Sequence, residues 1–152
     1  MTSVTLADFV AFIRAQRIIV NINGVVTTIT ISDSDLPDDS ADIQNAYDVT
    51  LARVATLLDS MYKTAFLNLA MHLLICYSNA EIFDNVKIAY KVDSLRTGVI
   101  GSASDNGTSA SWQAIPNFLA QLNGWENWLM TTPYGRNYFN IASQFSALIG
   151  WV

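Results

Sequence analysis

The stretch KTAFLNLAMHLLICYS, residues 63–78, has apolar side chains at nearly every position around a helix. A helix that is apolar on all sides is normally buried on all sides. The apolar part of this stretch, residues 65–77, is interrupted by Asn68 and His72 and is shorter than the roughly 20 apolar residues that a membrane span requires. We therefore expect a central helix, surrounded by the core of its own domain or by other subunits, and no membrane partner.

Three other stretches have the periodicity of amphipathic helices. Apolar residues recur every three to four positions in residues 6–16, in residues 42–61 and in a last helix that begins at Pro133. Proline is favoured at the first position of a helix because its missing N–H would have no partner there. The candidate N-caps are Thr5 for the first of these helices and Asp39 or Ser40 for the second.

Two stretches have the periodicity of strands. Residues 17–31 are rich in β-branched side chains around Asn23-Gly24, which predicts a β-hairpin insertion. Apolar residues alternate with Lys87, Ala89 and Lys91 over residues 86–92, which predicts a short strand.

A Gly- and Ser-rich loop spans residues 94–111, and within it Asp105-Asn106-Gly107 can turn a second hairpin. The resulting fold class is mainly α: a small bundle of about four to five helices with one or two β-hairpin insertions. With 152 residues, we expect a single domain over residues 1–152.

Composition excludes several classes of protein. Hydrophobic residues make up 51% of the chain and charged residues 14%, so intrinsic disorder is excluded. The formal net charge is −5 and the eight Lys and Arg residues are scattered, which argues against tight binding of nucleic acid. A single cysteine cannot form a disulfide within the chain, and the first residues lack the basic start of a secretory signal.

No residue pattern indicates catalysis, so we expect that the protein is not an enzyme and that it binds no metal and no cofactor. His72 and Cys76 are one helical turn apart, but on an apolar helix we interpret them as a hydrogen-bonded histidine and an inert thiol. The Gly-rich loop lacks a phosphate-binding signature, and the acidic residues 33–42 lack the central Gly and closing Glu of a calcium loop.

Aromatic residues are concentrated in the last third of the chain. Aromatic side chains dominate many protein interfaces because they bury a large area with few rotatable bonds. We expect Tyr138 and Phe145 to complete the core of the domain, and Trp151 to contact another chain. The interface candidates are Trp112, Tyr134, Gly135, Ile149, Trp151 and Val152, and residues 148–152 are predicted to be a C-terminal docking segment.

Several segments together resemble the head–tail connector (adaptor) proteins of tailed bacteriophages. These segments are LADFVAFI, LPDDSADIQNAYDVTLARV, AFLNLAMHLLICY, RTGVIGSASDNGTSASW and TTPYGRNYFNIA. The most specific parts are the Gly- and Ser-rich loop ahead of an aromatic residue and the start of the last helix, with Thr132, Tyr134 and Gly135. The hairpin at residues 17–31 and the stretch IPNFLAQLNGWEN depart from the family pattern.

The resemblance implies a structural protein of the virion neck, assembled in the host cytoplasm. Such a protein forms a dodecameric ring that binds the portal protein on one side and a head-closure or tail protein on the other. DNA passes through the axial channel without specific binding. The net negative charge of this chain agrees with that expectation, because like charges keep DNA from adhering.

Three alternatives stay open at this point. The first is another neck or tail-completion protein with the same helical plan. The second is a small enzyme that uses His72 or Cys76, and the third is a monomeric regulatory module.

Overall fold

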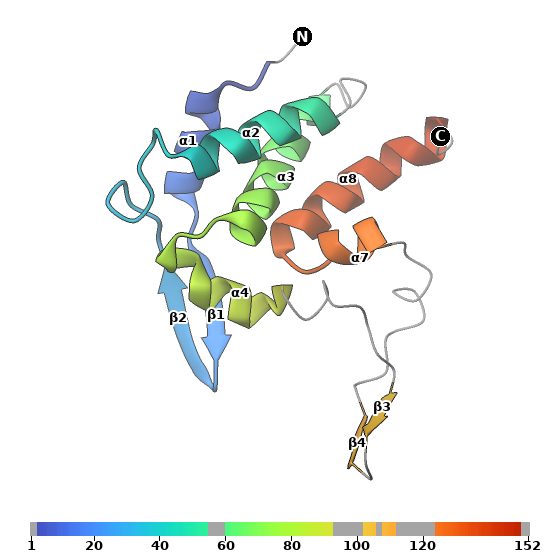
Figure 1. Ribbon diagram of the computed structural model, residues 1–152. Helices are drawn as coiled ribbons and strands as arrows, with labels where there is room; N and C mark the ends of the chain where they lie inside the picture. The colour runs from blue at the N-terminus through green and yellow to red at the C-terminus, as the bar shows by residue number, and fades with distance from the viewer. Residues whose placement is uncertain (1–2, 55–59, 93–101, 106–107, 112–123, 150–152) are drawn as a thin grey trace.

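The computed structural model describes residues 3–54, 60–92, 102–105, 108–111 and 124–149. It is mainly α-helical with small antiparallel hairpins, which confirms the predicted fold class (Figure 1). The elements are, in chain order, α1 (Leu6–Ala15), β1 (Ile18–Ile22), β2 (Val25–Ile29), α2 (Ala41–Arg53), α3 (Tyr62–Tyr77), η2 (Glu81–Phe83), α4 (Asp84–Tyr90), β3 (Ser102–Asp105), β4 (Thr108–Ser111), α7 (Gly124–Leu129) and α8 (Pro133–Ile149).

Helix α3 is the centre of the packing. It contacts α1, α2, α4 and α8, and all of its residues from Ala65 to Cys76 are buried (Figure 1). Burying one large aliphatic side chain stabilises a fold by roughly 1.5–3 kcal/mol, so this helix supplies a large part of the hydrophobic stabilisation. The prediction of a helix that is enclosed on every side is confirmed, and in this chain the domain itself provides most of the enclosure.

The first hairpin forms where the sequence predicts it. Strands β1 and β2 pair antiparallel from Ile18↔Ile29 to Ile22↔Val25. The two turn residues have positive φ angles, 53° at Asn23 and 83° at Gly24, as a tight two-residue turn requires.

Both predicted N-caps are present, although the second helix is shorter than expected. Thr5 caps α1 in a capping box with Asp8, and the Ser40 hydroxyl accepts a hydrogen bond from the Ile43 N–H at the start of α2. Helix α2 ends at Arg53 instead of continuing to residue 61, because the buried Val54 adopts an extended conformation. Apolar periodicity continues past Arg53 in the sequence, and periodicity alone does not mark the end of a helix.

The strand predicted over residues 86–92 is wrong, because the chain forms α4 there. Phe83 and Val86, three residues apart, are both buried, whereas Ile88 is 63% exposed. The packing of this helical face against α3 and β1 outweighs the short alternation in the sequence. The helix ends at Tyr90, and its C-cap residue Lys91 has a left-handed φ of 52°.

The second hairpin, β3 and β4, pairs antiparallel from Ser102↔Ser111 to Asp105↔Thr108, as expected for a turn at Asp105-Asn106-Gly107. Among the described residues, no single helix is long and apolar enough to cross a membrane. Within the described part of the chain, one pair of segments, α3 and Glu81–Tyr90, has the required length and apolar composition when taken together, but the two are bent by 100°.

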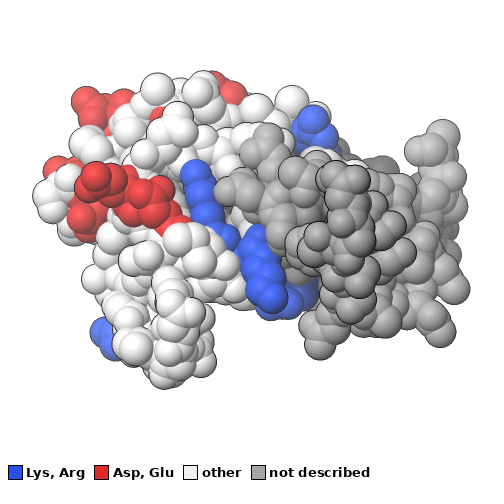
Figure 2. Space-filling model, turned by 60° about the horizontal axis from the view of Figure 1, so that its bottom comes forward, with Lys and Arg blue, Asp and Glu red and all other residues white. Residues whose placement is uncertain are grey.

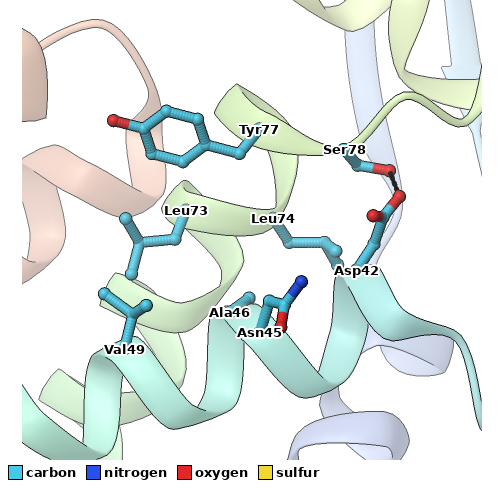
Figure 3. A pocket seen from close by; sticks show the side chains of 8 residues that line it. All are labelled: Asp42, Asn45, Ala46, Val49, Leu73, Leu74, Tyr77 and Ser78. Carbon is cyan, nitrogen blue, oxygen red and sulfur yellow. Dashed lines mark hydrogen bonds between the residues drawn. The ribbon is translucent and has the colours of Figure 1, made fainter.

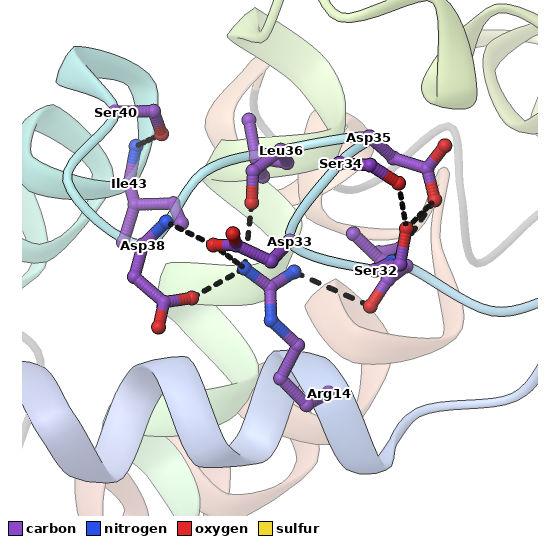
Figure 4. Close-up of polar contacts among 10 residues, drawn as sticks. Arg14, Ser32, Asp33, Ser34, Asp35, Leu36, Asp38, Ser40 and Ile43 are labelled. Atoms are coloured by element: carbon purple, nitrogen blue, oxygen red, sulfur yellow. Dashed lines mark hydrogen bonds and ion pairs between the residues drawn. The ribbon is translucent and has the colours of Figure 1, made fainter.

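The acidic segment between β2 and α2 is held to α1 by Arg14 (Figure 4). The Arg14 guanidinium donates hydrogen bonds to the carbonyl oxygens of Ile31 (3.2 Å) and Leu36 (2.6 Å) and pairs with the carboxylate of Asp38. These bonds fix the direction in which the chain enters α2.

Replacing this side chain tests its structural role. We expect Arg14→Met to lower the free energy of unfolding by about 1–2 kcal/mol, because the guanidinium, on a side chain that is 24% exposed, makes charge-assisted bonds to two backbone carbonyls. Urea unfolding followed by circular dichroism measures the change. The matched control, Arg17→Met at an exposed position, should alter stability by less than about 0.5 kcal/mol. Equal effects of the two substitutions would contradict the assignment.

Candidate interaction surface

Tyr134, one of the interface candidates, lies inside the domain. Its hydroxyl donates a hydrogen bond to Gln16 Oε1 at 3.1 Å, and its ring packs edge-on against Phe12 of α1. Burial raises the pKa of Tyr134 to about 12, which is consistent with a phenol that stays protonated. Tyr134 therefore joins the start of α8 to α1. Its predicted role in an interface with another chain stays a prediction.

Gly135, another candidate, lies where α8 closely approaches α3 and the end of α7. A Cβ atom on this residue would lie 2.0 Å from the carbonyl oxygen of Leu129 and 2.7 Å from His72 Nδ1. Only glycine fits so close an approach. The Thr-x-Tyr-Gly start of the last helix thus has a packing role in the monomer.

His72 is part of a buried hydrogen-bonded group at the same junction. Its Nδ1 lies 2.7 Å from Thr132 Oγ1, and Thr132 Oγ1 accepts a hydrogen bond from the Gly135 N–H at 3.0 Å. Cys76 Sγ lies 3.8 Å from His72 Nε2. Burial lowers the pKa of His72 to about 3, so the ring is neutral at physiological pH. These contacts agree with a histidine that is structural and hydrogen-bonded.

The other interface candidates cannot be placed in the same way. Trp112, Trp151 and Val152 lie outside the described residues, as does most of the docking segment predicted at residues 148–152. Ile149 is the last residue of α8, and only its backbone is described. Their roles stay predictions.

A hollow of about 180 Å³ lies between α2 and the C-terminal end of α3 (Figure 3). Val49 from α2 and Tyr77 from α3 flank it, with 42% and 57% of their surface exposed. At one end the Ser78 hydroxyl donates a hydrogen bond of 2.6 Å to the carboxylate of Asp42. The residues that line the hollow are Asp42, Asn45, Ala46, Val49, Leu73, Leu74, Tyr77 and Ser78. A mainly apolar floor with polar groups at the rim is typical of a site that receives an apolar side chain.

Aromatic side chains extend this surface from Tyr77 towards α7. The rings of Tyr77 and Trp128 are 5.7 Å apart, and those of Trp128 and Trp125 are 4.9 Å apart. The Arg53 guanidinium lies 4.8 Å from the centre of the Trp125 ring, a cation–π contact. Trp128 Nε1 is buried and has no hydrogen-bond acceptor among the described residues.

The first hairpin carries a second apolar surface. Ile18, Val20 and Ile29 are buried, but Ile19, Val25 and Val26 are 64–65% exposed. The strands contain no charged residue, and the tip of the hairpin projects beyond α4 (Figure 1). Natural sheet edges are usually protected by charges, prolines or bulges, and none of these devices is present in β1 or β2.

Charged side chains border these apolar surfaces, since Asp42 lines the hollow and Arg53 lies over Trp125. Figure 2 shows acidic side chains gathered at one side of the visible face and Lys and Arg side chains grouped nearer its middle. Within the described part of the chain, no three His, Cys, Asp or Glu side chains are arranged to hold a metal ion.

Sequence reasoning predicted the hairpin but missed both the hollow and the exposure of the hairpin. The exposure of the hairpin could have been inferred from its sequence. Apolar β-branched residues occupy both faces of β1 and β2, and a helix that packs on one face leaves the other face exposed. No sequence pattern indicates the hollow, because it depends on how two helices cross and local sequence does not specify that crossing.

The chain was compared with protein-family models, with curated proteins and with solved structures, and none of the three comparisons finds a match. The site is therefore interpreted from its own geometry.

The close approach at α8 gives the first test. We expect Gly135→Ala to lower the free energy of unfolding by about 3 kcal/mol, because the new methyl group collides with a backbone carbonyl and with His72. Thermal unfolding measures the loss, and Asn140→Ala at an exposed position of the same helix is the control. If the two variants unfold at the same temperature, the proposed close approach is wrong.

The buried imidazole gives the second test. An unfolded histidine binds a proton near pH 6.5, but folded His72 binds one only near pH 3. The unfolded state therefore binds more protons between these values, and the free energy of unfolding should fall by ~1.4 kcal/mol per pH unit as pH decreases.

Replacing His72 with Gln should remove this contribution to the slope. Urea unfolding at pH 4, 5 and 6 measures the slope, and the contribution of Asp8, whose bonds with Thr5 and Lys63 lower its pKa to about 2, is present in both chains. Identical slopes in the two chains would refute the neutral, buried histidine.

Proposed function

We propose that this chain is a non-enzymatic structural subunit of a bacteriophage neck. Copies of it form a ring, dodecameric by resemblance to the head–tail connectors, that joins the portal protein to a head-closure or tail protein. DNA passes through the ring without specific binding, and the subunit uses no cofactor. The ring assembles in the host cytoplasm and ends in the virion.

The observation that carries the proposal is the exposed apolar surface of the monomer. Single exposed apolar residues are ordinary, but here they are grouped at the hairpin and beside the α2–α3 hollow. The large hydrophobic residues exposed in the described part of the chain are Ile19, Val25, Val26, Val49, Leu51, Tyr77 and Ile88. Because the monomer already encloses α3, these residues are available to partner chains, as a protein that acts by assembly requires.

Two further features support the proposal. The Thr132, Tyr134 and Gly135 motif, which carries much of the family resemblance, sets the close packing of α8 on α3. The net charge of −5 suits a subunit that lines a path for DNA, since like charges repel the phosphate backbone.

The alternatives have less support from the geometry. A catalytic role would need access to the reacting atoms, and His72 and Cys76 are both buried. Another neck or tail-completion protein would use the same surfaces with a different neighbour, and a monomeric regulatory module would leave the grouped apolar residues uncovered.

Binding to the portal protein tests the proposal. The chain is mixed with portal rings from the phage whose genome encodes it, and the particles are imaged by electron microscopy. We expect class averages with an additional ring at one end of the portal. A chain that lacks residues 148–152 should keep its circular dichroism spectrum but lose this ring, because the predicted docking segment is gone.

The controls are the portal alone and the chain mixed with an unrelated ring-shaped protein. Portal particles that stay unchanged in excess chain would contradict the proposed function. A ring that persists with the truncated chain would contradict only the docking segment.

A further inference from the structure

Strand β2 has an outer edge that no described strand covers. It pairs with β1 in a two-stranded sheet, and β1 is the strand that packs against α4. Figure 1 shows β2 at the margin of the molecule. Exposed edges of this kind are usually protected by charges or prolines, and Val25–Ile29 contains neither.

The register identifies the backbone groups that point outward from β2. Ile22 and Val25 flank the two-residue turn, so they exchange hydrogen bonds across the hairpin. Along an antiparallel pair of strands, hydrogen-bonded pairs alternate with pairs that are not hydrogen-bonded. Val26 and Thr28 belong to the pairs that are not bonded, and they direct their N–H and C=O groups away from β1. These four groups can bind a strand of another chain.

The backbone of β2 is complementary to a second copy of itself. A two-fold axis through Thr27, the middle residue of the strand, pairs all five residues in antiparallel order. Val26 then lies opposite Thr28 of the second copy, so that outward-pointing groups meet outward-pointing groups. An axis moved by one residue to Val26 would pair only three residues of the strand.

The side chains also match in this register. Val25 is 65% exposed, and it would lie opposite Ile29 of the second copy. Thr27 would lie opposite Thr27 of the second copy, and threonine pairs stabilise antiparallel strands. The two copies of Arg17, which directly precedes β1, would lie at opposite ends of the joined sheet because the strands are antiparallel. No like charges therefore oppose the pairing.

We propose that two copies of this chain associate through the outer edges of β2 and form one four-stranded antiparallel sheet. The same surface is used on both copies, so the dimer has two-fold symmetry. The inference goes beyond the proposed function and does not rest on it. A two-fold contact stops at two copies and leaves the other surfaces of each copy available to other neighbours.

A charge exchange at the axis tests this dimer. Thr27→Lys places two ammonium groups opposite each other and Thr27→Glu places two carboxylates there, and like charges directly opposite destabilise a sheet. Sedimentation velocity over a range of concentrations measures association, and circular dichroism verifies that each variant is folded. Ile88→Lys and Ile88→Glu, at a position of α4 that is 63% exposed, are the matched controls.

We expect the wild-type chain and both Ile88 variants to dimerise as concentration rises. Each Thr27 variant alone should dimerise at least about tenfold more weakly, which corresponds to ~1.4 kcal/mol. An equimolar mixture of the two Thr27 variants should restore dimers, because opposite charges then meet at the axis. An equimolar mixture of the two Ile88 variants should dimerise no better than either variant alone.

Disulfide formation tests the register with a smaller substitution. Thr27→Cys should form a linked dimer with oxidised glutathione, because the Cα atoms of a pair that is not hydrogen-bonded are about 4.5 Å apart, within the range of a disulfide. Thr28→Cys is the control. Its two copies are offset by two residues, about 6.6 Å along the strands, and should react at least about tenfold more slowly. The native Cys76 is buried in all of these chains.

Other outcomes overturn the inference. A wild-type chain that stays monomeric at millimolar concentration shows that the edge binds a strand of a different protein or none. If Thr27→Lys dimerises like the wild type, the dimer forms through another surface. A mixture of the Thr27 variants that stays monomeric, or equal rates of disulfide formation at positions 27 and 28, contradicts the two-fold antiparallel register.

Discussion

Enclosure of α3 is the constraint on which the rest of the structure depends. Its buried residues include two polar side chains, Asn68 and His72, which would be costly to bury without partners. Asn68 donates a hydrogen bond to the Thr64 carbonyl one turn earlier and accepts one from the Asn137 side chain of α8. His72 bonds with Thr132 at the start of α8. The position of α8 along α3 is set by these polar contacts as well as by apolar packing.

This position determines the details of the last helix. To bring Thr132 within 2.7 Å of His72, the backbone of α8 must approach so closely that Gly135 has no room for a Cβ atom. Tyr134 then points towards α1 and reaches Gln16, so that the first and last helices are joined. A motif that resembles a family signature is therefore explained by packing, whichever protein the chain binds.

The helices α1, α2, α4 and α8 enclose α3, so the large apolar residues that are still exposed are not needed for the core of the monomer. They are not scattered over the whole surface, because the hairpin and the α2–α3 hollow carry Val25, Val26, Val49 and Tyr77. A chain in which 14% of residues are charged has few charged side chains to shield such surfaces. Assembly would remove them from water, which is the physical basis of the role proposed for the chain as a subunit.

The sequence by itself determined features that depend on neighbouring residues. The Asn23-Gly24 turn, the caps at Thr5 and Ser40 and the apolar α3 could all be predicted, because each rests on local conformation or on helical periodicity. Tertiary structure decided α4, where burial of Phe83 and Val86 on one helical face outweighs a local alternation.

Tertiary structure also decided the end of α2 at Arg53, where Val54 is buried in an extended conformation, and the hollow beside Val49, which depends on how α2 packs on α3. Local sequence specifies which backbone conformations are low in free energy, but only tertiary packing specifies which surfaces are left exposed.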